Sequence, residues 1–435
     1  MSTERAIVIG GGPGGACAAG LLAAHGVPVT LLERQRFPRH HVGESLQPAT
    51  FELLERHLGL SGELAAAGFA RKYGAVYVWG ESREPWSILF DSRLEEGVGD
   101  LSEGELLAGD YEHAWQVDRA RFDDILLRRA AALGADVRVE TAATEPIVEE
   151  GRVVGVALEG GGALRAEHVI DASGQRCLLG RALGVRRAVQ DLRFTASYCY
   201  LDGAGGFPGP LGRHVQWVVT VPHGWAWFIP ISPTRTSVGL VHDLRRAVSE
   251  TELLEAAADA GFPIEGATRV EGGARHARDW SYTSGQMAGP GWWLVGDAAC
   301  FVDPILSGGV ASAVQSGFHA ALSVLKAVSG EDEAAVSAEY DEALRRDYKA
   351  YLRLARYWYG NNRSVDGFFW EAHKEIPAHA TATPLRAFVY LTTGKYAAER
   401  HARVFDAWQE KKMFENMGVD REALRAARER KSGRR

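Results

Sequence analysis

The sequence predicts an α/β protein in which a doubly wound parallel sheet is joined by a second, β-sheet domain and a C-terminal helical region. A glycine-rich turn between two short apolar segments near the N-terminus predicts the first part. Alternating apolar and polar residues in the middle of the chain predict the second sheet, and helical periodicity after residue 332 predicts the third part. The 435 residues suffice for two or three domains.

The N-terminal forty residues form a complete strand–turn–helix–strand unit. Residues 6–9 and 29–32 are apolar runs suited to buried parallel strands, and residues 16–25 suit a helix packed closely on a sheet. The turn between them fits G-x-G-x-x-G, and an acidic residue ends the second strand. This context favours a Rossmann-like dinucleotide site over a purely structural turn, because glycines let the backbone approach a pyrophosphate at the helix N-terminus. The expected cofactor contacts here are Gly10, Gly12, Pro13, Gly14, Gly15, Glu33 and Arg34.

Composition narrows the class of protein. The net charge of −7 offers no broad basic surface, so nucleic acid is not an expected partner. The four cysteines are scattered and none stands in a C-x-x-C pair, so no metal site is expected. No apolar run reaches membrane-spanning length without Gly, Pro or charge, and no signal peptide precedes the first strand. We therefore expect a cytoplasmic protein without a membrane partner.

Three later segments indicate which dinucleotide is bound. Residues 116–123 open a helix, the strand 168–170 ends in Asp171-Ala-Ser-Gly, and the strand 293–295 ends in Gly-Asp297. In this order they resemble the FAD-binding fold of the aromatic hydroxylases, geranylgeranyl reductases and flavin-dependent halogenases. The resemblance implies FAD as the cofactor, with Arg119 on the flavin side and Asp297 at the ribityl and pyrophosphate groups. Asp297 also suits an N-cap of a following helix, and both roles are compatible.

The predicted domains are interleaved along the chain. The FAD-binding domain takes residues 1–80, 112–185 and 275–330, and a β-sheet domain on the substrate side takes 81–111 and 186–274. Residues 95–110 are acidic and contain Gly and Ser, which predicts a mobile loop. Residues 331–435 form the helical region with a basic tail, and Tyr340, Leu344 and Tyr348 share one helical face. The aromatic residues between 353 and 370 are expected mainly to pack its core.

Two further strings resemble one branch of these flavoproteins. Residues 224–230 fit G-W-x-W-x-I-P, and although two tryptophans at i and i+2 suit simple packing on one strand face, the whole string matches the signature of the flavin-dependent halogenases. The resemblance implies that Trp225 and Trp227 keep the organic substrate away from the flavin. Residues 37–48 are similar to a run in the phenol and pyrrole subgroup, which places Ser45 near the flavin. Their paired histidines, His40 and His41, are expected to be ordinary loop residues.

Residues 301–310 fit a second halogenase string, F-x-x-P-x-x-S-x-G. The resemblance implies a halide site at Ser307, Gly308 and Gly309 beside the flavin, with Val310 contacting the cofactor. N–H groups exposed at a helix start would suit an anion. The alternative is a loop whose glycines merely allow close approach to the cofactor. The family often has Ser or Thr where this chain has Gly308, which leaves halide choice open.

Lys72 is the only lysine in the first 325 residues, where arginine otherwise supplies positive charge. Lysine can lose its proton or act as a nucleophile, whereas a guanidinium does neither readily. Taken alone, the residue is most simply a surface lysine. In the halogenases, however, a lysine follows a Gly-Phe pair at this place, as it does after Gly68-Phe69 here. The resemblance therefore implies that Lys72 carries the active halogen to the substrate.

The resemblance covers nearly the whole chain, down to residues 366–370, and implies an FADH2-dependent halogenase of the phenol and pyrrole subgroup. Such an enzyme uses O2 and chloride or bromide on an electron-rich ring, free or tethered to a carrier protein, in secondary metabolite biosynthesis. The resemblance also implies a separate NAD(P)H-dependent flavin reductase as a partner. The chain carries no second G-x-G-x-x-G, so a stably bound NADPH is not expected. The alternatives are a hydroxylase, dehydrogenase or prenyl reductase of the same fold, or a carrier-binding or flavin-binding protein without turnover.

Overall fold

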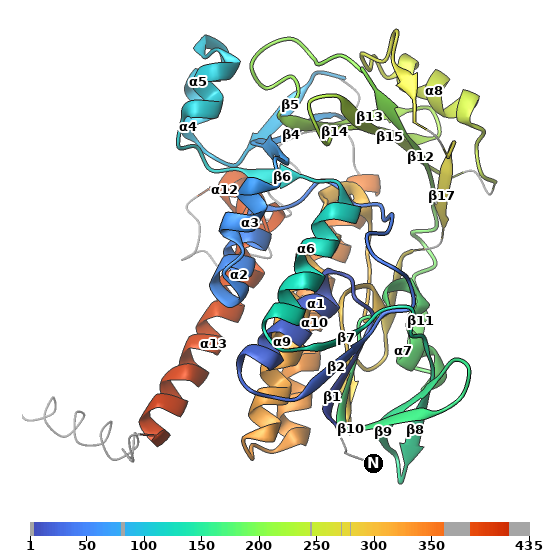
Figure 1. Cartoon of the computed structure of the whole chain (residues 1–435). Coiled ribbons are helices and arrows are strands. Elements are labelled where there is room, and N and C mark those ends of the chain that lie inside the picture. The colour runs from blue at the N-terminus through green and yellow to red at the C-terminus, as the bar shows by residue number, and fades with distance from the viewer. Residues whose placement is uncertain are drawn as a thin grey trace, which may run out of the picture.

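The computed structural model describes residues 4–79, 83–243, 246–270, 272–278, 280–360 and 383–416. Two sheets dominate the molecule, and the helices pack mainly around the first of them (Figure 1). Among these residues, no helix is long and apolar enough to cross a bilayer. The string at 366–370 and the basic tail lie outside the described residues.

The first sheet is parallel at its centre, in the order β20, β10, β1, β2, β7. Its strands are β1 (Glu4–Ile9), β2 (Val29–Leu32), β7 (Asp136–Arg138), β10 (Ala163–Asp171) and β20 (Trp292–Leu294). Antiparallel strands β8 (Ala143–Glu149), β9 (Arg152–Leu158) and β19 (Ala288–Gly289) extend it. The carboxyl ends of β1, β2, β10 and β20 therefore meet at one edge, where ligands bind in open parallel sheets.

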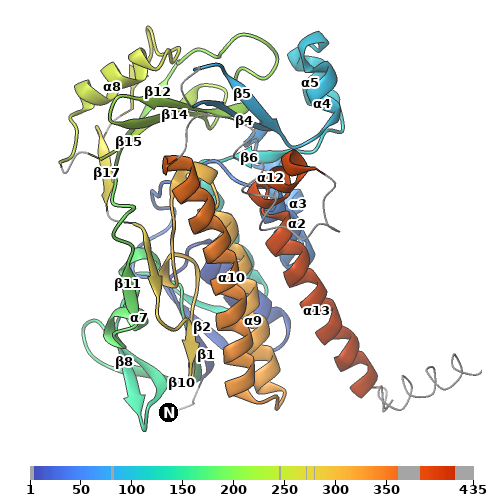
Figure 2. The ribbon, with the colours of Figure 1, turned by 180° about the vertical axis from the view of Figure 1, so that it is seen from behind.

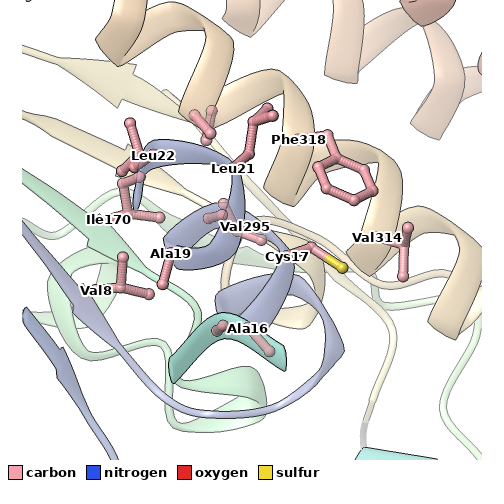
Figure 3. Close-up of a cluster of buried hydrophobic side chains, with 14 of the residues drawn as sticks. Val8, Ala16, Cys17, Ala19, Leu21, Leu22, Ile170, Val295, Val314 and Phe318 are labelled. Carbon is pink, nitrogen blue, oxygen red and sulfur yellow. The ribbon is translucent and has the colours of Figure 1, made fainter. Parts of the chain in front are cut away.

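Helix α1 (Pro13–Ala24) is buried almost throughout because it lies between this sheet and α9 (Gly309–Val328). Figure 3 shows how Val8, Ala16, Leu21, Val314 and Phe318 fill that space. A Cβ added to Gly317 would lie 2.2 Å from the carbonyl oxygen of Gly14, so the two helices touch where both residues are glycine. The small residues of the first turn therefore fix the position of α9 against the cofactor end of the sheet.

The second sheet runs in the order β16, β12, β15, β14, β13, β4, β5, with β17 also paired to β12. Its strands are β4 (Gly74–Val78), β5 (Trp86–Leu89), β12 (Thr195–Asp202), β13 (Val215–Val221), β14 (Gly224–Pro230), β15 (Arg235–His242), β16 (Thr268–Arg269) and β17 (Arg275–Arg278). Helix α8 (Glu250–Asp259) packs on it. β4 and β17 lie a few residues inside segments predicted for the first domain, and the domain boundaries stay predictions.

Short elements join the two sheets. Strands β3 (Ala70–Lys72) and β6 (Ala114–Gln116) form a two-stranded antiparallel ribbon. Helices α2 (Pro48–Leu58) and α3 (Ser61–Ala66) precede β3 in the chain, and α6 (Arg119–Ala132) follows β6. The pair β11 (Arg186–Ala188) and β18 (Tyr282–Ser284) and helix α7 (Leu178–Ala182) link the sheets on the other side.

The prediction of a mobile loop at residues 95–110 is wrong. The segment forms α4 (Arg93–Gly97), a 3-10 turn and α5 (Glu103–Ala108). Ser102 and Glu105 build a capping box at the start of α5, since each side chain accepts the other's backbone N–H. Leu94 and Leu106 are fully buried, so the acidic residues cover the outside of two short amphipathic helices.

The helical C-terminal region is confirmed over the described residues. Helix α10 (Glu333–Gly360) lies beside α9 in both whole-chain views, and α12 (Pro384–Thr392) and α13 (Lys395–Asn416) follow (Figure 2). Tyr340, Leu344 and Tyr348 are buried on one face of α10, as the periodicity predicts. The far end of α10 reaches the second sheet, where Trp358 contacts Tyr77 and Trp86.

Candidate active site

A cavity of about 300 Å³ lies at the carboxyl edge of the parallel sheet, within the range of roughly 300–1,000 Å³ usual for ligand pockets. The glycine turn, Glu33 and Arg34 line one end. Trp225, Trp227 and the start of α9 line the other end. The cavity thus joins the predicted dinucleotide site to the two strings that distinguish the halogenases.

The glycine turn is shaped for close approach of a phosphate. Gly10 has φ +101°, and a Cβ there would lie 2.4 Å from the Ala172 carbonyl oxygen. A Cβ on Gly14 would meet Val295 at 2.6 Å, and one on Gly15 would meet the Gly10 carbonyl oxygen at 1.9 Å. Helix α1 begins at Pro13 beside the cavity, and the N–H groups of its first turn have no acceptor within the helix. Free N–H groups and the helix dipole together fit a pyrophosphate.

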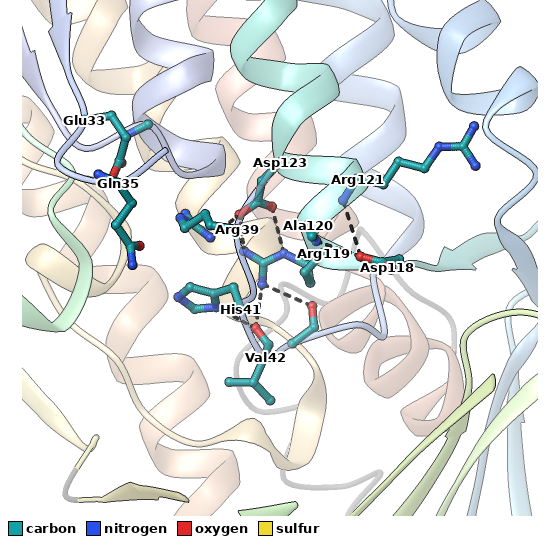
Figure 4. A network of polar contacts seen from close by, with 12 residues as sticks. Glu33, Gln35, Arg39, His41, Val42, Asp118, Arg119, Ala120, Arg121 and Asp123 are labelled. Carbon is teal, nitrogen blue, oxygen red and sulfur yellow. Dashed lines mark hydrogen bonds and ion pairs between the residues drawn. The ribbon is translucent and has the colours of Figure 1, made fainter. Parts of the chain in front are cut away.

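Glu33 lies at the end of β2 and organises the chain around the turn. Its Oε2 accepts the Gly11 N–H at 2.7 Å, and its Oε1 accepts the Gln35 N–H at 2.7 Å. Figure 4 shows the side chain beside Gln35. Each carboxylate oxygen keeps a second lone pair, so the residue can also accept a ribose hydroxyl from the cavity that it lines.

Arg119 opens α6, which Asp118 caps by accepting the N–H groups of Ala120 and Arg121. The Arg119 guanidinium is buried, pairs with Asp123 at 2.8 Å and donates to the Val42 carbonyl at 2.7 Å (Figure 4). These contacts fix residues 42–43 in the cavity wall. Arg119 also lines the cavity, so its position is compatible with the predicted contact on the flavin side.

Arg39 is a cavity residue that the sequence did not indicate. Its Nη1 lies 3.0 Å from Asp123 Oδ2, and this ion pair holds the guanidinium next to the glycine turn. A Cβ built on Gly12 would lie 3.4 Å from Arg39 Nη2. A cation here would add to the helix dipole in holding phosphate. Only the fold shows this, since Arg39 and Asp123 stand 84 residues apart. His41 also lines the cavity, and its expected status as an ordinary loop residue stays a prediction.

Asp297 lies in a 3-10 turn, Gly296–Ala298, and lines the cavity. The N-cap interpretation is wrong, because Val295 caps that turn and the next long helix begins only at Gly309. Burial raises the pKa of Asp297 to about 6, although Arg119 nearby lowers it. A half-buried carboxyl that faces the cavity fits a ligand rich in hydroxyl donors, such as a ribityl chain.

The predicted halide segment ends in a left-handed turn at Ser307 (φ +54°) followed directly by α9. The Ser307 N–H donates to the Pro304 carbonyl at 3.0 Å, and the Ser307 hydroxyl donates to Gln216 Oε1 at 2.8 Å. Both donors of Ser307 are therefore engaged within the protein. The N–H groups at the start of the 20-residue helix α9 have no acceptor within the helix, so main-chain donors at Gly309 and Val310 fit an anion best.

Both signature tryptophans lie on β14, are buried and line the cavity. Trp227 Nε1 donates to Ser237 Oγ at 3.1 Å. Trp225 Nε1 donates to the Tyr359 hydroxyl at 2.9 Å, and that hydroxyl donates to Asp303 Oδ1 at 3.0 Å. Burial raises the pKa of Asp303 to about 7. The indole of Trp225 is thus locked between the halide segment and α10, an arrangement that only the tertiary structure reveals.

Lys72 ends β3 and is only 3% exposed. Its Nζ donates to the Leu46 carbonyl at 3.1 Å and lies 5.4 Å from the centre of the Phe90 ring. None of the ion pairs among the described residues includes it, and burial lowers its pKa to about 7. Lys72 does not line the cavity itself; it lies behind Leu46, the residue that follows Ser45 in the cavity wall.

The cavity thus brings together a glycine turn, Glu33, Asp297 and the start of α9 at the carboxyl edge of a doubly wound sheet, an arrangement that fits a dinucleotide-binding flavoprotein. The family described as tryptophan halogenase matches residues 5–99 and 99–421. The chain belongs to this family and is a flavin-dependent halogenase, an enzyme that uses FADH2 and a halide. The predicted fold, cofactors and enzyme class are confirmed, whereas the roles of individual site residues stay predictions.

Known relatives agree with this assignment. Chondromyces crocatus tryptophan 2-halogenase is 32% identical over 403 residues, 86% of this chain and 72% of that protein. The 1H-pyrrole-2-carbonyl-(peptidyl-carrier protein) chlorinase of Pseudomonas fluorescens is 31% identical over 388 residues, 82% of this chain and 83% of that protein. The solved structure of the myxobacterial chondrochloren halogenase CndH, an FAD-dependent halogenase, superposes with a TM-score of 0.74 at 35% identity, covering 91% of this chain and 90% of that one.

Proposed function

We propose that this enzyme halogenates an electron-rich aromatic ring, a phenol or a pyrrole, and that Lys72 delivers the active halogen. The observation that carries the proposal is the state of Lys72. Burial without an acidic partner lowers its pKa to about 7, so a large share of the amine is neutral near neutral pH. A neutral amine can take up halogen or donate a hydrogen bond, whereas an arginine stays charged.

The halide would be held at the far end of the cavity by the first N–H groups of α9, with Gly309 allowing close approach. Gly308, also predicted for the halide, lines a neighbouring cavity instead. A Cβ on Gly309 would lie 2.9 Å from the Phe301 ring, so a larger residue would displace an aromatic side chain of the cavity wall. Bound reduced flavin and O2 would supply the oxidising power that converts the halide to hypohalous acid. Gly10 to Gly15, Glu33, Arg39, Arg119 and Asp297 would hold the cofactor.

Trp225 and Trp227 would keep the organic substrate out of the flavin cavity. Both indoles face the cavity and both are anchored by hydrogen bonds through their ring N–H groups. The oxidant, not the ring, would therefore travel to the place where the two meet. Lys72 would act in one of two ways: its amine takes up the halogen to form a haloamine, or it donates a hydrogen bond that polarises the hypohalous acid.

The second substrate would come from a biosynthetic pathway, free or tethered to a carrier protein. One relative in Pseudomonas fluorescens is named for a pyrrole on a peptidyl-carrier protein, which supports a tethered substrate here. A separate NAD(P)H-dependent flavin reductase would supply FADH2. A cytoplasmic location remains a prediction. We also propose that the basic residues near the end of the sequence contact an acidic carrier protein. If deletion of the residues after Lys412 leaves turnover of a tethered substrate unchanged, this part of the proposal is wrong.

The substrate class can be tested directly. Purified enzyme, flavin reductase, FAD, NADH and O2 would be combined with chloride or bromide and with phenols and pyrroles, each free and carrier-bound. We expect a halogen isotope pattern on a phenol or pyrrole, dependent on halide. Oxygenated product that forms without halide would instead support a hydroxylase and contradict the proposal.

A further inference from the structure

Gln116 is a completely buried amide whose polar atoms are unused. It is 0% exposed, and neither Nε2 nor Oε1 has a hydrogen-bond partner among the described residues. Leaving a buried donor or acceptor unsatisfied destabilises the folded protein, so native proteins rarely tolerate two such atoms on one side chain without a reason. Such a group can mark local strain, a position for an ordered water or ion, or a catalytic role.

The position of Gln116 follows from the ribbon of β3 and β6. Gln116 pairs with Ala70, and Lys72 pairs with Ala114, in an antiparallel register without a bulge. Because side chains alternate along a strand, Lys72 and Gln116 project from the same face, on one diagonal. Diagonal neighbours lie about 7–8 Å apart, within reach of two long side chains. The other diagonal, Ala70 and Ala114, carries only short side chains, so no other long side chain of the ribbon shares this face with the amide and the amine.

Ser45 connects this face of the ribbon to the flavin cavity. Ser45 forms an isolated bridge with Gln116, and it lines the cavity that Lys72 does not reach. Its hydroxyl oxygen is buried and also has no hydrogen-bond partner among the described residues. The next residue, Leu46, accepts the Lys72 amine at its carbonyl and donates its N–H to Trp115. Three polar side chains, Ser45, Gln116 and Lys72, therefore gather around one short segment between cavity and amine.

We propose that Gln116 binds the hypohalous acid and holds it beside Lys72, an inference that rests on the proposed function. Hypohalous acid is a small neutral molecule with one O–H donor and an oxygen acceptor. A primary amide offers the complementary pair, since Oε1 accepts the O–H and Nε2 donates to the oxygen. The amide is uncharged, so it holds the oxidant without drawing a proton onto Lys72. The Ser45 hydroxyl is the first polar group on the cavity side.

The replacement Gln116→Met tests this binding role, because methionine keeps the length of the side chain and removes the amide. The assay runs in bromide with the phenol or pyrrole on which the wild type is most active, together with an enol trap such as monochlorodimedone. We expect aromatic product to fall about tenfold, as for the loss of one to two hydrogen bonds, while total oxidant, product plus trap, stays within about twofold. Gln315→Met is the matched control, since the Gln315 amide donates to the Gly394 carbonyl outside the cavity.

Two results with Gln116→Met would overturn the inference: an unchanged share of product, or an equal fall of product and total oxidant. Gln116→Glu gives an independent readout. A carboxylate beside Lys72 would favour the charged amine, so the pH profile of halogenation should move to higher pH; an unmoved profile contradicts the assigned neighbourhood. Lys72→Ala separates this inference from the proposed function. If Lys72→Ala forms as much aromatic product as the wild type, the proposed role of Lys72 is wrong. If Lys72→Ala loses the product but Gln116→Met forms it at the wild-type level, only the proposed role of Gln116 is wrong.

Discussion

Replacing Lys72 by methionine should stabilise the protein while removing its activity. Burial lowers the pKa of Lys72 from 10.5 to about 7. The unfolded chain therefore binds more protons than the folded one between these two values, and the cost of burying the charge corresponds to roughly 4–5 kcal/mol below pH 7. This cost shrinks as pH rises and vanishes above the unfolded pKa. Methionine avoids the cost but loses the bond to Leu46 and the contact with Phe90, worth roughly 1–2 kcal/mol together.

The expected net gain for Lys72→Met is therefore about 2–3 kcal/mol at pH 7 and close to zero or negative at pH 10.5. Guanidinium unfolding followed by tryptophan fluorescence at both pH values measures it, with Lys326→Met as the control. Lys326 is the suitable comparison because its amine is paired with Glu339 at 2.7 Å, so no gain is expected from its loss. Equal or lower stability of Lys72→Met than of the wild type at pH 7 would refute the argument that this amine is held at a cost.

Two further replacements test the walls of the cavity. Tyr359→Phe should lower the free energy of unfolding by about 1–3 kcal/mol, because it leaves Trp225 Nε1 without its acceptor and removes one donor from buried Asp303; thermal or denaturant unfolding checks it, and a change within about 0.5 kcal/mol would contradict the network. Gly309→Ala should raise the KM for bromide about tenfold, since its Cβ would lie 2.9 Å from the Phe301 ring and disturb the N–H groups at the start of α9. Titrating bromide at saturating substrate measures it, and an unchanged KM would place the halide elsewhere.

The cofactor end of the site was predictable because its signals are local. Gly10 to Gly15 and Glu33 lie within one unit of strand, turn, helix and strand, so their spacing alone brings them together. The position of Arg119 was also predictable from the sequence, since Asp118 marks the start of its helix. The capping box of Ser102 and Glu105 was equally local, and its S-x-x-E spacing could have corrected the expected loop at 95–110.

The remaining features depend on contacts between distant segments. Asp123 draws Arg39 to the glycine turn, and Tyr359 at the end of α10 joins Asp303 to Trp225. No periodicity in the sequence links these residues. Gln116 lies in the same short run that predicts the start of α6, but its burial opposite Lys72 follows only from the register of β3 and β6. The resemblance implied that Ser307 contacts the halide. In the structure, the Ser307 hydroxyl donates its hydrogen bond to Gln216 Oε1, a contact that the sequence does not indicate.

The central claim, that Lys72 delivers halogen formed elsewhere in the protein, is tested most directly by the fate of the oxidant in Lys72→Ala and Lys72→Arg. Each variant would be compared with the wild type in bromide, with aromatic substrate and an enol trap present together. We expect that both variants still oxidise bromide, lose nearly all aromatic product and release the oxidant to the trap. Aromatic product from Lys72→Ala at the wild-type rate would contradict it.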